Sequence, residues 1–166
     1  AESFRGLGEK EKALEWYKKR VALGQNGQDL FWALMHIGRL HEELHYPHTT
    51  VIDGYYQAYI AGPGHVEPIY CLSHLYNHLK EHLLAYECIK GWEYIMAHEK
   101  KEQAPLNGWM LDYGLKLELL VSTFYLKKYD EFLQVSEQLL APDTLPEEIR
   151  AKVVTYRKFV LSSNHE

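Results

Sequence analysis

The sequence predicts an all-α fold, namely an α-solenoid of stacked antiparallel helix pairs that ends in a C-terminal capping helix. Apolar residues recur at intervals of three and four along most of the 166 residues, as amphipathic helices require. No convincing stretch alternates with the period of two that marks a half-buried strand. In addition, one helix pair is similar in sequence to the next, which is typical of a repeat protein.

Glycine and proline divide the first part of the chain into helices. A first helix of about three turns ends near Gly24. A second runs from residue 30 to residue 46, where Pro47 disfavours helical backbone in the residue before it. The segment 50–53 (TVID) resembles a capping box, in which a hydroxyl and a carboxylate satisfy free amides, and its helix runs to about Ile60.

Similar signals mark the later helices. The segment 62–64 (GPG) ends the third helix, and Pro68 suits the first turn of a fourth. A turn near Lys80 separates that helix from a fifth, which a polar loop at 99–108 follows. The remaining helices are expected at 109–126, at 130–140 and after the capped start Thr144-Leu145-Pro146-Glu147.

Internal similarity indicates that the helices form repeated pairs. The segment 31–36 (FWALMH) aligns with 69–74 (IYCLSH), with an offset about four residues longer than the common repeat of 34. At nearly the same offset, the aromatic pair 16–17 falls on the pair 55–56. Each pair has an apolar face too broad to bury alone, so neighbouring pairs must cover it and a last helix must close the array.

Charge and composition argue against two classes of partner. The chain has 18 Lys and Arg against 23 Asp and Glu, for a formal net charge of -5, and its basic residues are scattered, so we expect no nucleic-acid partner. No window approaches about 18 consecutive apolar residues, so we expect no membrane segment. Cys71 and Cys88 are not in CxxC spacing and fit core positions in a reducing compartment, so we expect a cytoplasmic location.

The length suits a single helical repeat domain over residues 1–166. The chain opens at Ala1 without Met, and its first helix is similar to the second half of a pair whose first half is missing. We therefore expect a fragment of a longer polypeptide.

The chain resembles the divergent tetratricopeptide-like domain attached to family-two glycosyltransferases of bacteria and large DNA viruses. The likeness covers nearly the whole chain and is carried by several short segments. They are 17–20 (YKKR), 31–34 (FWAL), 37–40 (IGRL), 56–59 (YQAY), 67–70 (EPIY) and, less closely, 112–115 (DYGL) with 118–119 (EL). The resemblance implies a right-handed solenoid that acts as a non-catalytic module beside a nucleotide-sugar transferase. No Asp-x-Asp pair follows a strand, so any such chemistry is expected outside this segment.

One segment matches a catalytic motif. His41-Glu42-Glu43-Leu44-His45 fits HExxH, in which two histidines one helical turn apart hold zinc and the glutamate activates water. Glu67 would be a possible third ligand. Against a zinc peptidase, the helix is expected to end at Tyr46, no edge strand is predicted to align a peptide, and Glu67 also suits a helix start. We expect no metal and no cofactor, and keep the peptidase as the alternative function.

Three further histidines recur at intervals of four. His74, His78 and His82 would share a helix face, which is one way to bind a metal ion. The turn expected near Lys80 separates His82 from the other two. A solvated or groove-lining histidine face is therefore favoured over a metal site.

Candidate binding residues follow from the resemblance, because the first helix of each tetratricopeptide pair lines a concave groove. Aromatic side chains flanked by hydrogen-bonding groups suit a peptide or a sugar ring, although Trp32 and Tyr70 suit packing against neighbouring helices equally well. The groove residues carried over are Trp32, His36, Arg39, Tyr70, His74, Asn77, Asp112, Tyr113 and Lys116.

Three functions follow in order of preference. The first is a non-catalytic binding or scaffolding module of a larger, glycosyltransferase-type protein, which binds a protein segment or an acceptor glycan on its concave face. The second is a zinc hydrolase built on His41, Glu42 and His45. The third is a self-associating structural repeat, motivated by the open end that a missing first helix would leave.

Overall fold

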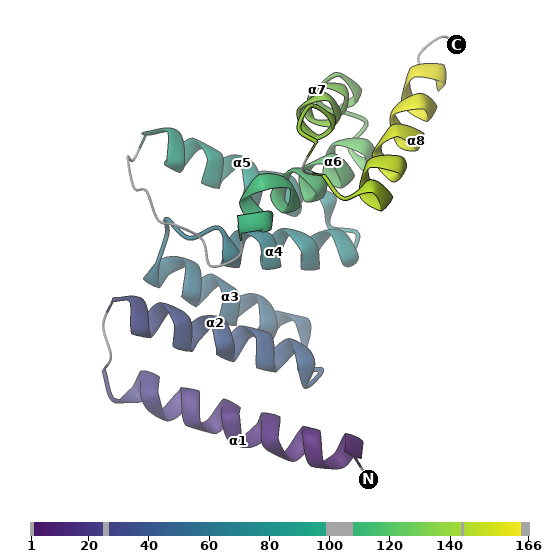
Figure 1. Cartoon of the computed structure of the whole chain (residues 1–166). Coiled ribbons are helices and arrows are strands. Elements are labelled where there is room, and N and C mark those ends of the chain that lie inside the picture. Colours follow the sequence, from purple (N-terminus) through teal and green to yellow (C-terminus); the bar gives the residue numbers. More distant parts are fainter. Residues whose placement is uncertain (1, 25–26, 99–107, 144, 164–166) are drawn as a thin grey trace. The chain divides into compact units, whose positions relative to one another are not determined.

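The computed structural model describes residues 2–24, 27–98, 108–143 and 145–163, and all regular structure within these ranges is helical, which confirms the all-α prediction (Figure 1). The elements are α1 (Glu2–Ala22), α2 (Gln28–Glu43), α3 (His48–Ala61), α4 (Glu67–His78), α5 (His82–His98), the π-helical turn η1 (Met110–Gly114), α6 (Leu115–Tyr125), α7 (Tyr129–Leu140) and α8 (Glu147–Ser163).

Contacts divide the chain into two compact units, which are described separately. Unit 1 contains α1, α2, α3 and the first part of α4, up to Leu72. Unit 2 begins at Ser73 and contains the rest of α4 and the elements from α5 to α8. A single domain over residues 1–166 stays a prediction.

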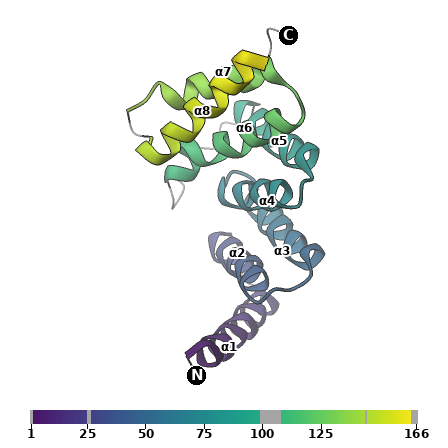
Figure 2. The same ribbon diagram turned by 90° about the vertical axis from the view of Figure 1, so that its right-hand side faces the viewer.

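In unit 1, α2 packs against both α1 and α3 (Figures 1 and 2). The buried side chains include Phe31 on α2 and Tyr55 on α3. The two helices approach closely where glycine faces glycine, since a Cβ placed on Gly54 would lie 3.0 Å from the Cα of Gly38. The close packing of α2 on α3 therefore requires residues without a side chain at this crossing.

In unit 2, α6 packs against α5 and α7, and α8 packs against α7. Ile89 of α5, Leu119 of α6, Phe132 of α7 and Val153 of α8 are all buried. Each of these residues has at least one apolar neighbour three or four positions away on its own helix, so the core of unit 2 agrees with the amphipathic pattern of the sequence.

Three helices end in the same left-handed turn. The residue with positive φ is His45 after α2 (56°), Lys80 after α4 (64°) and Lys127 after α6 (58°). In each turn its N–H donates to the carbonyl three residues back, and the next N–H donates to the carbonyl five residues back, over 2.8 to 3.1 Å. This pair of hydrogen bonds defines the Schellman motif. The turn predicted near Lys80 is thus confirmed, whereas α2 ends at Glu43, three residues before the predicted end at Tyr46, because the left-handed turn at His45 stops it before Pro47 is reached.

Two predicted helix starts differ from the structure. The capping box at 50–53 is wrong, because α3 begins at His48 directly after Pro47 and no side chain caps it. Pro47 is the N-cap residue, and its carbonyl accepts hydrogen bonds from the N–H groups of Thr50 and Val51, so Thr50 lies within the first turn. The first helix is longer than about three turns, since α1 already begins at Glu2.

The helix expected at 109–126 opens with the π-helical turn η1. Here the ring of Trp109 folds over Gly114, and a Cβ on Gly114 would lie 2.8 Å from the Cζ3 atom of that ring. The bulky ring and the bare glycine are compatible with the wider turn, which periodicity alone does not reveal. Apart from Gly108, the loop expected at 99–108 lies outside the described residues, as does Thr144 of the last predicted cap.

Replacing Lys127 with glycine is expected to stabilise the protein by about 1 kcal/mol, because a left-handed backbone costs a residue with a side chain roughly that much. The free energy of unfolding from urea titrations measures the change. Lys12→Gly is the control, since Lys12 is exposed inside α1 and glycine there costs about 1 kcal/mol. Equal destabilisation by both changes would contradict the prediction.

Candidate functional site

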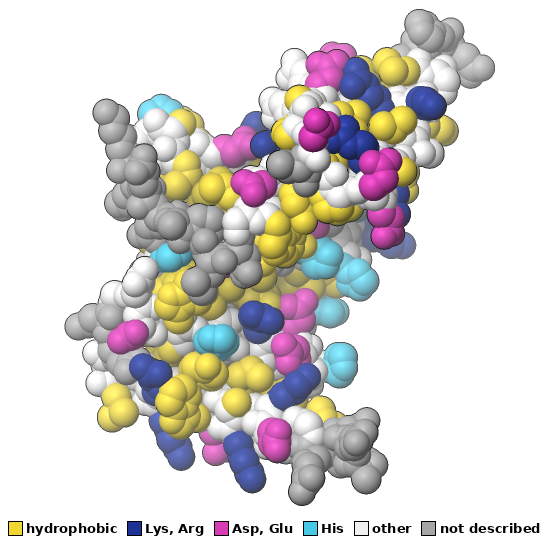
Figure 3. Space-filling model, in the orientation of Figure 1, with side chains coloured by type: hydrophobic (Ala, Val, Ile, Leu, Met, Phe, Trp, Pro, Cys, Tyr) yellow, Lys and Arg dark blue, Asp and Glu magenta, His cyan; other side chains and the backbone are white. Residues whose placement is uncertain are grey.

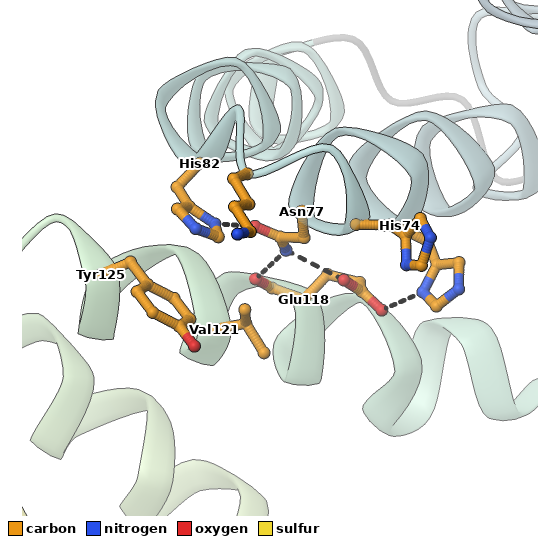
Figure 4. Close-up of a pocket in the computed structure, with 8 residues that line it drawn as sticks. His74, Asn77, His82, Glu118, Val121 and Tyr125 are labelled. Carbon is orange, nitrogen blue, oxygen red and sulfur yellow. Dashed lines mark hydrogen bonds and ion pairs between the residues drawn. The ribbon is translucent and has the colours of Figure 1, made fainter. Parts of the chain in front are cut away.

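An open pocket of about 600 Å³ lies in unit 2 between the end of α4, the start of α5 and α6 (Figure 4). We call it the polar pocket. Most of its lining side chains can form hydrogen bonds, in contrast to the apolar core beneath it. The principal lining residues are His74, Asn77, His82, Glu118, Val121 and Tyr125, and His78 and Lys80 complete the lining.

The Schellman turn at Lys80 brings two walls of the polar pocket together. It reverses the chain between α4 and α5, so that His82 at the start of α5 returns to Asn77 near the end of α4. The Nδ1 atom of His82 lies 3.0 Å from the Oδ1 atom of Asn77 and donates to it when Nδ1 carries the proton. Figure 4 shows Asn77 between His82 and Glu118.

Asn77 and Glu118 form the centre of a hydrogen-bond network. The Asn77 amide donates to both the backbone carbonyl and the Oε2 atom of Glu118, each over 2.9 Å. His74 Nδ1 lies 2.8 Å from the other carboxylate oxygen, Oε1. The hydroxyl of Ser122 lies 3.1 Å from Asn77 Oδ1. Because both oxygens of the nearly buried carboxylate are engaged, this wall of the pocket is held in one arrangement before any ligand arrives.

His82 packs against the aromatic rim of the polar pocket, and its pKa is shifted by its surroundings. Its ring stacks on Tyr125 with a centroid distance of 4.2 Å and an interplanar angle of 5°. Desolvation lowers the pKa of His82, the charge of Lys80 lowers it further, and Glu81 opposes the change. His82 is therefore predominantly neutral at neutral pH, and Lys80 brings an ammonium group to the pocket lining. Figure 3 shows histidine side chains gathered where α4 ends.

Of the nine residues predicted for a groove, the structure brings His74 and Asn77 into the polar pocket. Three others lie on η1 and the start of α6 and do not line it. The Nζ atom of Lys116 lies 3.4 Å from the backbone oxygen of Asp112, and the ring of Tyr113 packs against Trp109. Their place in a groove stays a prediction.

The four predicted residues of unit 1 lie in other surroundings. The ring of Trp32 packs edge-on against Phe31, with a centroid distance of 4.7 Å, and His36 stacks on Tyr17 at 4.6 Å. Arg39 is exposed and Tyr70 is half-buried. Packing on Phe31, the preceding residue of α2, accounts for part of the surface of Trp32, and its place in a groove stays a prediction.

Six residues that line the polar pocket were not among the nine predicted groove residues. Three of them, Glu118, Val121 and Tyr125, lie on α6, 41 to 48 residues after Asn77. The other three, His78, Lys80 and His82, lie at or beside the Lys80 turn. One sequence signal could have identified Glu118, because it lies on the otherwise apolar stripe of α6. A carboxylate is rarely buried without a partner, so a glutamate at such a position indicates polar side chains nearby.

The HExxH segment has a different geometry from a zinc peptidase. His41 lies buried in α2, with neither ring nitrogen hydrogen-bonded, and Glu42 accepts a hydrogen bond from the hydroxyl of Tyr55 over 2.5 Å. His45 is exposed and lies beyond the end of α2, in the left-handed turn, so the two histidines do not share a helix face. Glu67 is buried beside His65. Among the described residues, no three His, Cys, Asp or Glu side chains group in a way that holds a metal ion.

The two cysteines carry free thiols. Desolvation raises the pKa of Cys71 to about 12 and that of Cys88 to about 11. Because the thiolate is the nucleophilic form, neither side chain suits nucleophilic catalysis.

Comparisons of the chain with protein-family models, with curated proteins and with solved structures find no match. In the part of the chain that the structure describes, no helix has both the length and the apolar character needed to cross a membrane. The geometry of the polar pocket is therefore the main basis for a functional proposal.

His41 is expected to make the protein sensitive to acid. Desolvation and the charge of Lys18 lower its pKa below 6.5, while Asp53 acts in the opposite direction. A lowered pKa in the folded state means that the stability is fully present above about pH 6.5 and is lost as the pH falls through the folded value. His41→Leu should reduce this loss, measured as the free energy of unfolding in urea between about pH 7.5 and pH 5.

Part of the loss should remain in His41→Leu, because desolvation also lowers the pKa values of His36 and His65. Stability at neutral pH should not fall, since the change removes two buried nitrogen atoms without partners. The exposed residue His48 offers the control His48→Leu. If His41→Leu and wild type lost equal stability in acid, the role assigned to His41 would be wrong.

Asn77→Ala is expected to destabilise unit 2 by about 1 to 3 kcal/mol, because it leaves the nearly buried carboxylate of Glu118 without one donor. Urea unfolding followed by circular dichroism measures the loss. The exposed bond from Gln57 to Asp53 supplies the control Gln57→Ala, which should change stability by less than about 0.5 kcal/mol. A neutral Asn77→Ala would show that the network does not hold the pocket wall.

Proposed function

We propose that the chain is a non-catalytic binding and scaffolding module, a right-handed α-solenoid of tetratricopeptide-like helix pairs within a larger, glycosyltransferase-type polypeptide. The recurring Schellman turns after α2, α4 and α6 support this repeat, since each ends the first helix of an expected pair. The similarity of segment 31–36 to segment 69–74 supports it independently, because these segments begin the corresponding helices α2 and α4.

The polar pocket carries the proposal. Two residues expected on the binding surface, His74 and Asn77, lie in its lining, and the network through Glu118 fixes their positions. A wall that is ordered beforehand loses little entropy on binding, which favours recognition of a ligand. We infer that the ligand is a segment of another protein, bound by the donors and the aromatic rim of the pocket.

The hydrogen bonds of Glu118 favour a binding role over catalysis. Its two carboxylate oxygens face His74 and Asn77, so the group orients neighbouring side chains within the protein. The zinc-peptidase alternative has less support, because His45 lies beyond the helix that carries His41. The net charge of -5 makes a nucleic-acid ligand unfavourable, and we propose neither a membrane nor a cofactor as a partner.

Val121→Arg is expected to weaken ligand binding without unfolding the protein. Val121 lines the pocket and is 39% exposed, so the longer, charged side chain would occupy space that a ligand needs. The immobilised protein is used to select binders from a random-peptide display library and from a printed glycan array. Peptides that wild type retains should bind Val121→Arg at least about tenfold more weakly, a loss of about 1.4 kcal/mol.

Leu84→Arg is the matched control, since Leu84 is an exposed apolar residue of α5 outside the pocket lining. It adds the same charge and should leave binding unchanged. If the protein retained glycans and no peptides, its ligand would be a glycan and not a protein segment. Equal binding by wild type and Val121→Arg, or no binder from either library, would contradict the proposed function.

A further inference from the structure

A second pocket adjoins the polar pocket in unit 2. It has a volume of about 170 Å³ and lies between α6, α7 and α8. We call it the aromatic pocket, because aromatic rings make up most of its wall. Its lining residues are Leu120, Val121, Phe124, Tyr125, Phe132 and Tyr156.

Val121 and Tyr125 line both pockets. They are four residues apart on α6 and therefore lie on one face of that helix. His82 stacks on one face of the Tyr125 ring, but both residues stay well exposed, Val121 at 39% and Tyr125 at 60%, so the ridge that they form is open to a ligand. A ligand lying across this ridge would reach the polar pocket on one side and the aromatic pocket on the other.

The polar pocket offers a positive charge to such a ligand. The Lys80 ammonium forms no hydrogen bond or ion pair with any described side chain, whereas the carboxylate of Glu118 already has donors on both oxygens. The neighbouring carboxylate of Glu81 does not line the pocket. An acidic group on the ligand therefore complements this side of the site.

The aromatic pocket is suited to one large apolar side chain. The ring of Phe124 lies 5.8 Å from that of Phe132 and 5.9 Å from that of Tyr156, between centroids, so the wall is a continuous aromatic surface. Its volume of about 170 Å³ is below the roughly 300 Å³ at which pockets for whole small molecules begin. Pockets of this kind commonly hold a single anchoring residue at a protein interface.

We propose that the two pockets form one bipartite site for a protein segment that carries an acidic side chain close to a large apolar one. The acidic side chain lies against Lys80, the apolar side chain enters the aromatic pocket, and the backbone between them crosses Val121 and Tyr125. This inference rests on the proposed function and names the chemistry of its ligand.

Peptides selected from the random-peptide library test the inference by their composition. Those that bind wild type more tightly than Val121→Arg should share an Asp or Glu within a few residues of a Phe, Trp or Leu. Their affinity should fall as salt is added, because the Lys80 contact is exposed and therefore screened. Selection of basic or purely apolar peptides would overturn the inference.

Fluorescence polarisation with one selected peptide and its variants tests whether the two contacts belong to one site. Lys80→Asn removes the charge, and asparagine tolerates the left-handed backbone at φ 64°. Lys80→Asn should lower the affinity for the peptide about threefold to fivefold. When the acidic residue of the peptide is replaced by its amide, wild type and Lys80→Asn should bind equally well. Tyr156→Ala should lower the affinity for the same peptide about tenfold. It should have no effect on a peptide variant that lacks the large apolar residue.

Tyr94→Ala is the control, because Tyr94 of α5 is 66% exposed and lies in neither pocket. It should leave binding unchanged. If every peptide responded to only one of Lys80→Asn and Tyr156→Ala, the pockets would be separate sites and the inference would fail, while sensitivity to Val121→Arg would still support the proposed function. If Val121→Arg also left binding intact, the proposed function itself would fail.

Discussion

The chain reverses direction after α2, α4 and α6 by placing one residue in the left-handed region, and the residues there, His45, Lys80 and Lys127, have side chains larger than that of glycine. The carbonyl groups at the helix ends are satisfied by the same two hydrogen bonds each time. The turn at Lys80 sets the distance between Asn77 and His82, and hence the width of the polar pocket. The turn at Lys127 returns α7 along α6, which places Phe132 beside Phe124.

These turns also account for the sequence that imitates a zinc motif. In a Schellman turn the residue after the left-handed position commonly contacts the residue five positions earlier. Here Tyr46 covers His41, with ring centroids 4.7 Å apart. His41 is thereby buried and His45 takes the left-handed position. The spacing that resembles HExxH is therefore explained by the way in which α2 ends.

Much of the fold could be predicted from the sequence, because helical periodicity and the placement of glycine and proline are local signals. The Lys80 turn and the position of Pro68 in the first turn of α4 followed from them, and the end of α2 was placed three residues too late. Local signals failed where packing or a competing cap decided the outcome. Thr50 offered a hydroxyl at a position that Pro47 had already made part of α3, and η1 depends on how Trp109 lies on Gly114.

The candidate site was harder to predict. The positions of His74 and Asn77 in the repeat were enough to select them as candidate site residues. Glu118, which hydrogen-bonds to Asn77, lies 41 residues further along the chain, and no local pattern predicts a contact over that separation. The same reasoning selected Trp32 and His36, whose rings pack on Phe31 and Tyr17. Periodicity identifies the face on which a residue lies, whereas neighbouring rings determine whether that face stays accessible.

Lys80 combines two roles that conflict. Its backbone adopts the conformation that glycine would adopt with less strain, while its ammonium group faces the polar pocket. A designer who optimised this chain for thermal resistance, or who rebuilt it from a consensus, would choose glycine there and lose the cation. If Lys80 binds a ligand as proposed, a gain in stability at this position would therefore be a loss in binding.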